Sequence, residues 1–201
     1  MRLNQVLSAL LTHLEITFLG VSLSCAIGIP AASLLRKSPQ TARSVLAAVD
    51  VIQTVPTLAM LTFMMLIFGL NNTTVIAAIV LYSLFPVVRN TYAGMAGVER
   101  GIIRAGKGNG MTELQIYTKL ELPLALPVIL SGIRLALVSA LGIATTGVLI
   151  GAGGLGMLIW RGIQTRNALM MLSGAVPVSL LAVFLDYLLS YSEKKLGSKV
   201  K

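Results

Sequence analysis

The chain has 201 residues, of which 56% are hydrophobic and only 11% are charged. Soluble domains average about 45–50% apolar and about 25% charged residues, so a soluble fold of this length cannot bury so much apolar surface, and the surplus must face lipid or partner subunits. The net charge of +9 is gathered between long apolar runs, which favours a membrane protein and argues against nucleic acid as a partner.

The single cysteine and the single histidine limit which disulfides and metal sites this chain can form. Cys25 excludes an intrachain disulfide, and a lone His13 makes a histidine-based metal cluster unexpected. We find no residue pattern that performs chemistry. The chain is therefore expected not to be an enzyme and to hold no cofactor or metal of its own.

Five apolar stretches are long enough to cross a membrane, which takes roughly 20 residues. They cover residues 14–35, 45–70, 75–96, 124–150 and 169–189. Residues 1–13 precede them, and residues 193–201 form a basic tail after a single membrane domain of residues 14–192. Pro56 and Pro177 lie inside spans and predict kinks rather than helix ends, because neighbouring groups can satisfy the freed carbonyls. The sequence predicts an all-α integral membrane protein.

Lysine and arginine are distributed unevenly over the two predicted sides of the membrane. One side carries Arg36, Lys37, Arg43, Arg100, Arg104, Lys107, Lys119, Lys194, Lys195, Lys199 and Lys201, and the other carries Arg2, Arg161 and Arg166. Cytoplasmic loops are enriched in these residues. We therefore expect the N-terminus outside and the C-terminus in the cytoplasm, as an odd number of spans requires.

Two motifs resemble nucleotide-binding loops, but each lacks its structural context. Residues 101–108 match the Walker A spacing as far as Lys107, yet Gly108 stands where a magnesium-binding Ser or Thr belongs. Residues 151–156 fit GxGxxG, yet a long span precedes them and no acidic residue follows before Asp186. Neither motif predicts nucleotide binding by this chain.

The glycine-rich motif has a different physical interpretation. Gly151, Gly153, Gly154 and Gly156 predict a tight, close-packed backbone at the outer end of the fourth span. Irregular backbone at membrane depth must be covered by protein or face a water-filled cavity. We expect this loop to border the outer mouth through which a solute enters.

The polar segment of residues 97–123 is the most informative part of the chain. Met111, Leu114, Tyr117 and Leu120 give one apolar helical face, and Thr112 is a suitable residue to begin a short helix. Pro123 is expected to end that helix and begin the next span. An amphipathic helix between spans fits either a partner's groove or the lipid headgroups, and the pattern leaves both open.

The same segment carries a family resemblance. Arg104-Ala105-Gly106, then Gly110, then Leu120-Glu121-Leu122-Pro123 resembles the "EAA" loop of ABC importer permeases. Arg104 replaces the glutamate of that motif and Gly106 its second alanine, whereas Gly110 and Pro123 keep their spacing. Residues 52–59, 85–92, 151–156 and 161–163 resemble the osmoprotectant branch, so the resemblance covers nearly the whole chain.

The resemblance implies a type I ABC importer permease with five spans and a cytoplasmic coupling helix, in the cytoplasmic membrane of a bacterium. It implies four partners besides lipid: an ATPase subunit that binds ATP and magnesium, a second permease of identical or homologous sequence, an extracytoplasmic substrate-binding protein, and the solute, which is glycine betaine, carnitine or choline. It places six residues at or near the ATPase contact: Arg104, Ala105, Gly106, Gly110, Met111 and Thr112.

Ionisable residues inside spans are costly and are functional candidates by default. Arg134 lies in the fourth span and Asp50 in the second. Both spans begin at the predicted cytoplasmic side, and both residues are counted from that side. We predict that these two side chains form an ion pair between helices.

Several alternatives remain at this stage. A methionine-importer permease shares the five-span plan and a similar glycine-rich loop. An ion-coupled carrier or channel would also use intramembrane charges and kinked helices. A membrane scaffold would not need the spacing of Gly110 and Leu122-Pro123. Only 5% of residues are aromatic, which argues against a dedicated aromatic cage for a quaternary ammonium solute in this chain.

Overall fold

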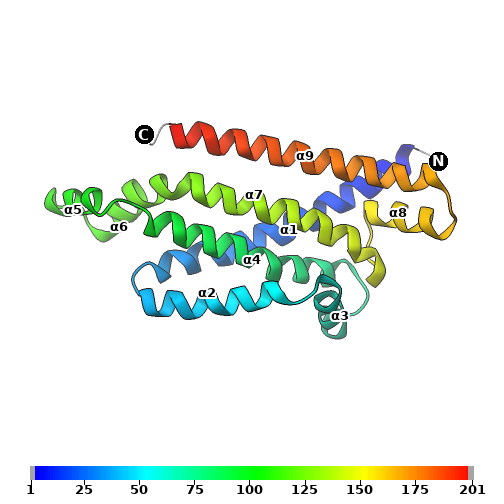
Figure 1. The fold of residues 1–201 in the computed structure, drawn as a ribbon, viewed down its shortest axis with the longest axis horizontal. Coiled ribbons are helices and arrows are strands. Elements are labelled where there is room, and N and C mark those ends of the chain that lie inside the picture. Colours follow the sequence, from blue (N-terminus) through cyan, green and yellow to red (C-terminus); the bar gives the residue numbers. More distant parts are fainter. Residues whose placement is uncertain (1–2, 199–201) are drawn as a thin grey trace.

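The structure is a computed structural model that describes residues 3–198, and within them it is helical, without strands. Four long helices run along the molecule: α1 (Leu3–Leu35), α4 (Asn72–Ala96), α7 (Leu122–Thr146) and α9 (Ala168–Ser198) (Figure 1). All four are long and apolar enough to cross a membrane. Four of the five predicted spans are thereby confirmed as continuous helices.

The core of the molecule lies around α4, which packs against both α1 and α7. The helices approach closely because glycines face them at the crossings. A Cβ atom on Gly132 of α7 would lie 2.6 Å from the carbonyl oxygen of Pro86 in α4, and one on Gly20 of α1 would lie 2.5 Å from Cγ2 of Ile79. In lipid the hydrophobic effect does not drive helices together, so their association depends on close van der Waals packing, which small residues at the crossings permit.

The second predicted span is not one helix but two. α2 (Pro39–Thr54) and α3 (Thr57–Phe68) meet at an angle of 98°. Pro56 immediately precedes α3, and Val55 before it is extended, with φ −67° and ψ 127°, because a residue that precedes proline is disfavoured in the helical region. The prediction of a mere kink at Pro56 is wrong. Pro177 lies inside α9, which continues through it.

The helices at the two ends are longer than predicted. α1 begins at Leu3, so the described part of the segment before residue 14 is the start of the first helix. α9 runs to Ser198 and includes most of the basic tail. Both exceed the roughly 20 residues that a bilayer needs, so each projects beyond the apolar layer or tilts within it. Arg2, Lys199 and Lys201 lie outside the described residues.

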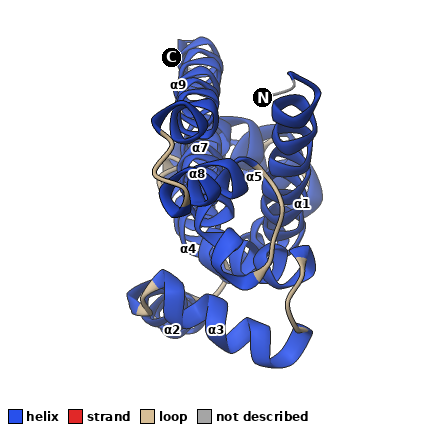
Figure 2. Cartoon of the chain, turned by 90° about the vertical axis from the view of Figure 1, so that its right-hand side faces the viewer, coloured by secondary structure: helices blue, strands red, loops and turns tan. Residues whose placement is uncertain are grey.

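Most of the described lysines and arginines lie at one end of the bundle. α5 (Arg100–Gly108), α6 (Glu113–Ile116), the end of α1 and the start of α2 lie together at the left of Figure 1. We call this the basic end, since its described lysines and arginines are Arg36, Lys37, Arg43, Arg100, Arg104, Lys107 and Lys119. The opposite end carries α3 and α8 (Leu155–Gln164). Viewed along the bundle, α2 and α3 lie at one side of it and α9 at the other (Figure 2).

Candidate functional site

The coupling segment, which we define as residues 100–121, is built from three short helical pieces at the basic end. α5 is followed by a turn at Gly110, whose φ of +76° suits glycine. Thr112 then begins α6 with a capping box: its hydroxyl accepts from the Gln115 N–H at 3.3 Å, and its own N–H donates to Gln115 Oε1 at 2.9 Å. The predicted helix start at Thr112 is confirmed.

The helix does not stop at Pro123, as the sequence analysis expected. A π-helical turn, η1 (Tyr117–Glu121), joins α6 directly to α7, and the helical run extends from Glu113 to Ile150. Within this wide turn the Leu122 N–H donates to the Tyr117 carbonyl, five residues back. Pro123 has no N–H to donate, and the wider turn before it lets the helix continue. Single π turns of this kind are frequent at functional sites.

The six residues predicted at the ATPase contact do not share one environment. Arg104, Ala105, Gly110 and Thr112 are exposed, and Met111 is partly buried. Gly106 instead faces inward, where an added Cβ would lie 2.8 Å from Cδ1 of Leu120. The predicted apolar face is divided as well, because Leu114 is 70% exposed. The exposed residues form a surface that a partner can reach, and Gly106 holds α5 against the rest of the segment.

An ion pair joins the two short helices of the segment. Lys107 Nζ lies 2.8 Å from Glu113 Oε1, and both side chains are more than half exposed. The hydrogen bond and positive charge of Lys107 hold the pKa of the Glu113 carboxyl below its usual value. The pair joins α5 to the start of α6.

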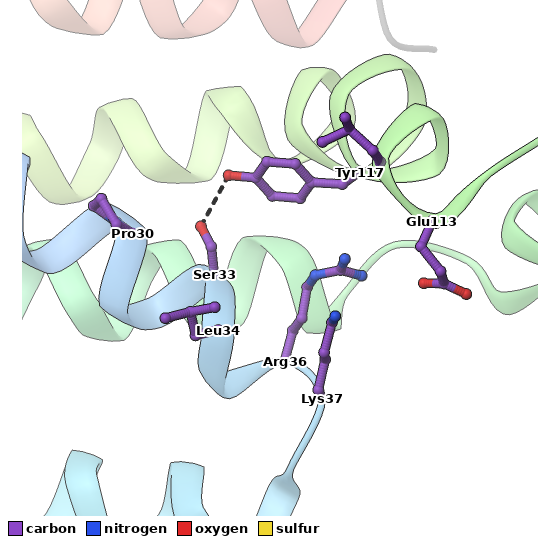
Figure 3. A pocket seen from close by; sticks show the side chains of 8 residues that line it. Pro30, Ser33, Leu34, Arg36, Lys37, Glu113 and Tyr117 are labelled. Carbon is purple, nitrogen blue, oxygen red and sulfur yellow. Dashed lines mark hydrogen bonds between the residues drawn. The ribbon is translucent and has the colours of Figure 1, made fainter.

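A cavity of about 500 Å³ lies between the end of α1 and the coupling segment (Figure 3). Its lining residues are Pro30, Ser33, Leu34, Arg36, Lys37, Glu113, Leu114 and Tyr117. The Tyr117 hydroxyl lies 3.1 Å from Ser33 Oγ, and the Arg36 side chain forms an ion pair with Glu121. We call Ser33, Arg36, Tyr117 and Glu121 the clasp. The sequence analysis missed it because its two halves are about 80 residues apart.

A second cavity of about 500 Å³ lies at the break between α2 and α3. Its lining residues are Gln53, Thr54, Val55, Pro56, Thr57, Tyr82, Ser139, Gly142, Ile143 and Thr146, and we call it the break pocket. Tyr82 lies near the middle of α4, with ten residues before it and fourteen after it. The pocket is therefore near mid-depth in the bundle, where a polar lining is unusual.

The chemistry of the break pocket is polar but uncharged. Because α2 ends at Thr54, the last carbonyls of this helix lack partners from the next turn. The Tyr82 hydroxyl donates a hydrogen bond to the carbonyl of Val55, the extended residue that follows α2. A helix C-terminus carries a partial negative charge that favours cations. The sequence signal was present, in the polar pair Gln53-Thr54 before Pro56 within an apolar run, but it did not identify the partners from α4 and α7.

The glycine-rich loop forms a tight turn at the opposite end, as predicted. Gly151 and Gly154 have φ values of +79° and +99°, and the Gly153 N–H donates to Asn72 Oδ1 of α4 at 2.9 Å. Gly156 packs against the Thr145 carbonyl of α7. A cavity of about 510 Å³ lies beside this turn, between the start of α1 and α8. The role of the loop as an outer mouth stays a prediction.

The predicted ion pair between Arg134 and Asp50 is wrong. Arg134 lies 3.6 Å from both Asp186 and Glu193 of α9, whereas Asp50 accepts from Arg89 of α4 at 2.9 Å. The reason is packing: α7 lies against α9, and α2 lies against α4. Among residues 3–198 no group of three or more histidine, cysteine or acidic side chains is arranged to hold a metal ion.

Comparison with known proteins identifies relatives over most of the chain. The family model described as "Binding-protein-dependent transport system inner membrane component" matches residues 24–198. The glycine betaine/carnitine/choline transport system permease protein OpuCD of Bacillus subtilis (strain 168) is 42% identical over 193 residues, which cover 96% of this chain and 84% of that protein. The choline transport system permease protein OpuBD of the same organism is 43% identical over 186 residues, or 92% of this chain and 82% of that protein.

Solved structures agree on the fold. The MetNI methionine ABC transporter, in an inward-facing conformation, matches with a TM-score of 0.81 at 24% identity, over 99% of this chain and 97% of that one. An amino acid ABC transporter crystallised with histidines matches with a TM-score of 0.77 at 22% identity, over 96% of this chain and 94% of that one. At these identities the likeness concerns the fold alone, and it confirms the type I importer permease fold that the resemblance implied.

Proposed function

This chain belongs to the family of binding-protein-dependent transport system inner membrane components, and on that premise we propose that it is the membrane-spanning permease of an ATP-driven importer of quaternary-ammonium osmoprotectants. The solute is glycine betaine, carnitine or choline. The chain itself catalyses nothing; a separate ATPase binds ATP and magnesium, and an extracytoplasmic protein delivers the solute. A second permease, identical or homologous, completes the path.

Support for the solute class comes from the relatives, since OpuCD and OpuBD are named for these solutes and match 92–96% of this chain. The break pocket fits the same class. A quaternary ammonium group donates no hydrogen bonds and is attracted by carbonyl dipoles and by aromatic faces. The C-terminal end of α2 offers the carbonyl dipoles and Tyr82 offers the aromatic ring. One aromatic ring and no charged lining residue suit brief contact during passage rather than tight binding.

The coupling segment is the proposed docking surface for the ATPase. In this arrangement Arg104, Ala105, Gly110, Met111 and Thr112 face the partner, at the basic end, which lies in the cytoplasm. Gly106 contributes from within by holding α5 in place. Nucleotide-driven movement of the ATPase shifts this segment and, through the continuous run from Glu113 to Ile150, shifts α7 beside the break pocket.

Transport by the assembled complex tests the proposal. The chain is purified with the proteins that accompany it and is reconstituted in vesicles, and uptake of labelled glycine betaine, carnitine, choline and methionine is measured with and without ATP. We expect ATP-dependent uptake of at least one quaternary ammonium solute and none of methionine. Uptake without any ATPase would identify an ion-coupled carrier instead, and uptake of methionine alone would identify the sibling class.

Substitutions in the break pocket test the proposed path. Thr54→Val and Ser139→Ala remove hydroxyls from its lining. We expect uptake to fall about fivefold, which corresponds to roughly 1 kcal/mol. Thr62→Val is the matched control, because Thr62 is an exposed threonine on α3 outside the pocket, whose hydroxyl also bonds its own helix, as that of Thr54 does. Equal uptake by all three variants would remove the pocket from the path.

A further inference from the structure

The clasp joins the end of α1 to the π turn between the coupling segment and α7. Arg36, just beyond α1, forms an ion pair with Glu121, and the two side chains are only 15% and 8% exposed. The Arg36 guanidinium also lies over the ring of Tyr117, 5.2 Å from its centre. A planar guanidinium can satisfy a carboxylate and a ring at once. One arginine therefore contacts both ends of η1.

A hydrogen bond with a defined direction completes the clasp. The Ser33 hydroxyl donates its only proton to the carbonyl of Ile29, at 2.7 Å. The Tyr117 hydroxyl must therefore be the donor in its 3.1 Å bond to Ser33 Oγ (Figure 3). The two ends of the π turn are thus attached to Ser33 in the last turn of α1 and to Arg36 just after it, through largely buried side chains.

The coupling segment behind the clasp is internally braced. Gly106 packs against Leu120, Lys107 pairs with Glu113, and the capping box of Thr112 fixes the start of α6. The coupling segment should therefore move as one unit when a partner displaces its exposed surface. Along the chain it reaches α7, and across the clasp it reaches α1.

We propose that the clasp transmits the movement of the coupling segment to α1, so that Arg36 and Glu121 are positioning residues for ATP-driven transport. This inference rests on the proposed function, because it presupposes an ATPase that docks on the segment. The Arg36–Glu121 pair of the clasp is largely buried, whereas most of the proposed docking residues are exposed, so loss of the clasp is expected to leave docking intact. It interrupts the step in which ATP hydrolysis by the partner changes the arrangement of the spans.

The experiment uses the complete complex with Arg36→Gln, Arg36→Lys and Glu121→Gln. Three quantities are measured: the amount of ATPase that copurifies, its basal rate, and its stimulation by the binding protein loaded with glycine betaine. We expect Arg36→Gln and Glu121→Gln to keep the copurified ATPase and its basal rate. Stimulation of the ATPase by the loaded binding protein should fall about fivefold or more, because the coupling between the two sites is lost. Arg36→Lys keeps the charge and should retain part of the stimulation.

Lys37→Gln is the matched control, since it removes a neighbouring exposed positive charge outside the clasp and should leave stimulation unchanged. Normal stimulation in Glu121→Gln would overturn the inference. Loss of the copurified ATPase would overturn it too, because the clasp would then serve docking or folding. If the unaltered complex contains no ATPase, the proposed function itself fails, and that result is read before any variant is compared.

Discussion

At the scale of single residues, three arginines show how packing selects partners for charges. Arg36, Arg89 and Arg134 lie in or beside spans, and each faces an acidic residue of another element. Their environments differ: the Arg36 pair is largely buried, whereas the Arg89 pair is about half exposed on both sides. A buried pair is costly to break because the remaining charge is left without water, so the pair of the clasp is the more sensitive of the two.

The shared acidic partners of Arg134 give a testable non-additivity. Asp186→Asn or Glu193→Gln alone leaves one carboxylate 3.6 Å from Arg134, so each should cost little stability. The double variant leaves the arginine without a counter-charge, and we expect it to exceed the sum of the two by about 1 kcal/mol. Thermal unfolding in detergent measures this, with Glu15→Gln as an exposed control. Strict additivity would show that the network contributes nothing.

Gly156 gives a second prediction at this scale. A Cβ atom at this position would overlap the Thr145 carbonyl, which is backbone and cannot rotate away. Gly156→Ala should therefore lower the unfolding free energy by ~2 kcal/mol, as over-packing does, and should lower the Tm in detergent. Gly108→Ala is the control, since an added Cβ there meets nothing within 4 Å. An unchanged Tm for both would contradict the close contact.

At the scale of elements, the break between α2 and α3 matters most. Proline alone does not break a helix here, because Pro30, Pro86, Pro127 and Pro177 all lie inside continuous helices. At Pro56 the chain turns by 98°, and Tyr82 of α4 satisfies the carbonyl of Val55 that the break leaves free. The break is stable because a neighbouring helix supplies the missing donor.

Removing the Tyr82 hydroxyl tests whether it stabilises the break between α2 and α3. Tyr82→Phe keeps the buried ring and deletes only the hydroxyl, so the Val55 carbonyl loses its partner at mid-depth. We expect a loss of about 1–2 kcal/mol in stability, measured as a lower Tm in detergent. Tyr187→Phe, on a side chain that is 72% exposed, should have no effect. A stable Tyr82→Phe variant would mean that another group satisfies the break.

At the scale of the whole molecule, the excess of lysine and arginine at the basic end predicts how the protein is oriented in the membrane. The basic end should lie in the cytoplasm by the positive-inside rule. In a Cys25→Ser background, single variants Thr165→Cys at the opposite end and Lys37→Cys at the basic end are treated with a membrane-impermeant maleimide in intact cells. We expect Thr165→Cys to react at once and Lys37→Cys only after permeabilisation. The reverse pattern would invert the proposed topology.

The sequence by itself determined the class of this protein and the existence of its elements. Apolar stretches of about 20 residues indicate spanning helices. Local composition located four continuous spans approximately, but it missed the break in the second predicted span and the greater length of α1 and α9. Thr112 and Gly110 likewise set the start of α6 and the turn before it by local capping and backbone geometry. The motif around Gly110 and Pro123 pointed to the importer family, which the match over residues 24–198 confirmed.

Only the tertiary structure decided which distant residues meet. Arg134 faces α9 rather than Asp50, Arg36 reaches Glu121 of the π turn, and Tyr82 supports the break at Pro56. Each outcome depends on which helices pack side by side, and the apolar faces of spans are too alike in sequence to specify their neighbours. Close backbone approaches belong to the same packing: Gly132 of α7 meets α4 and Gly156 of α8 meets α7, and a Cβ atom at either position would overlap a backbone carbonyl.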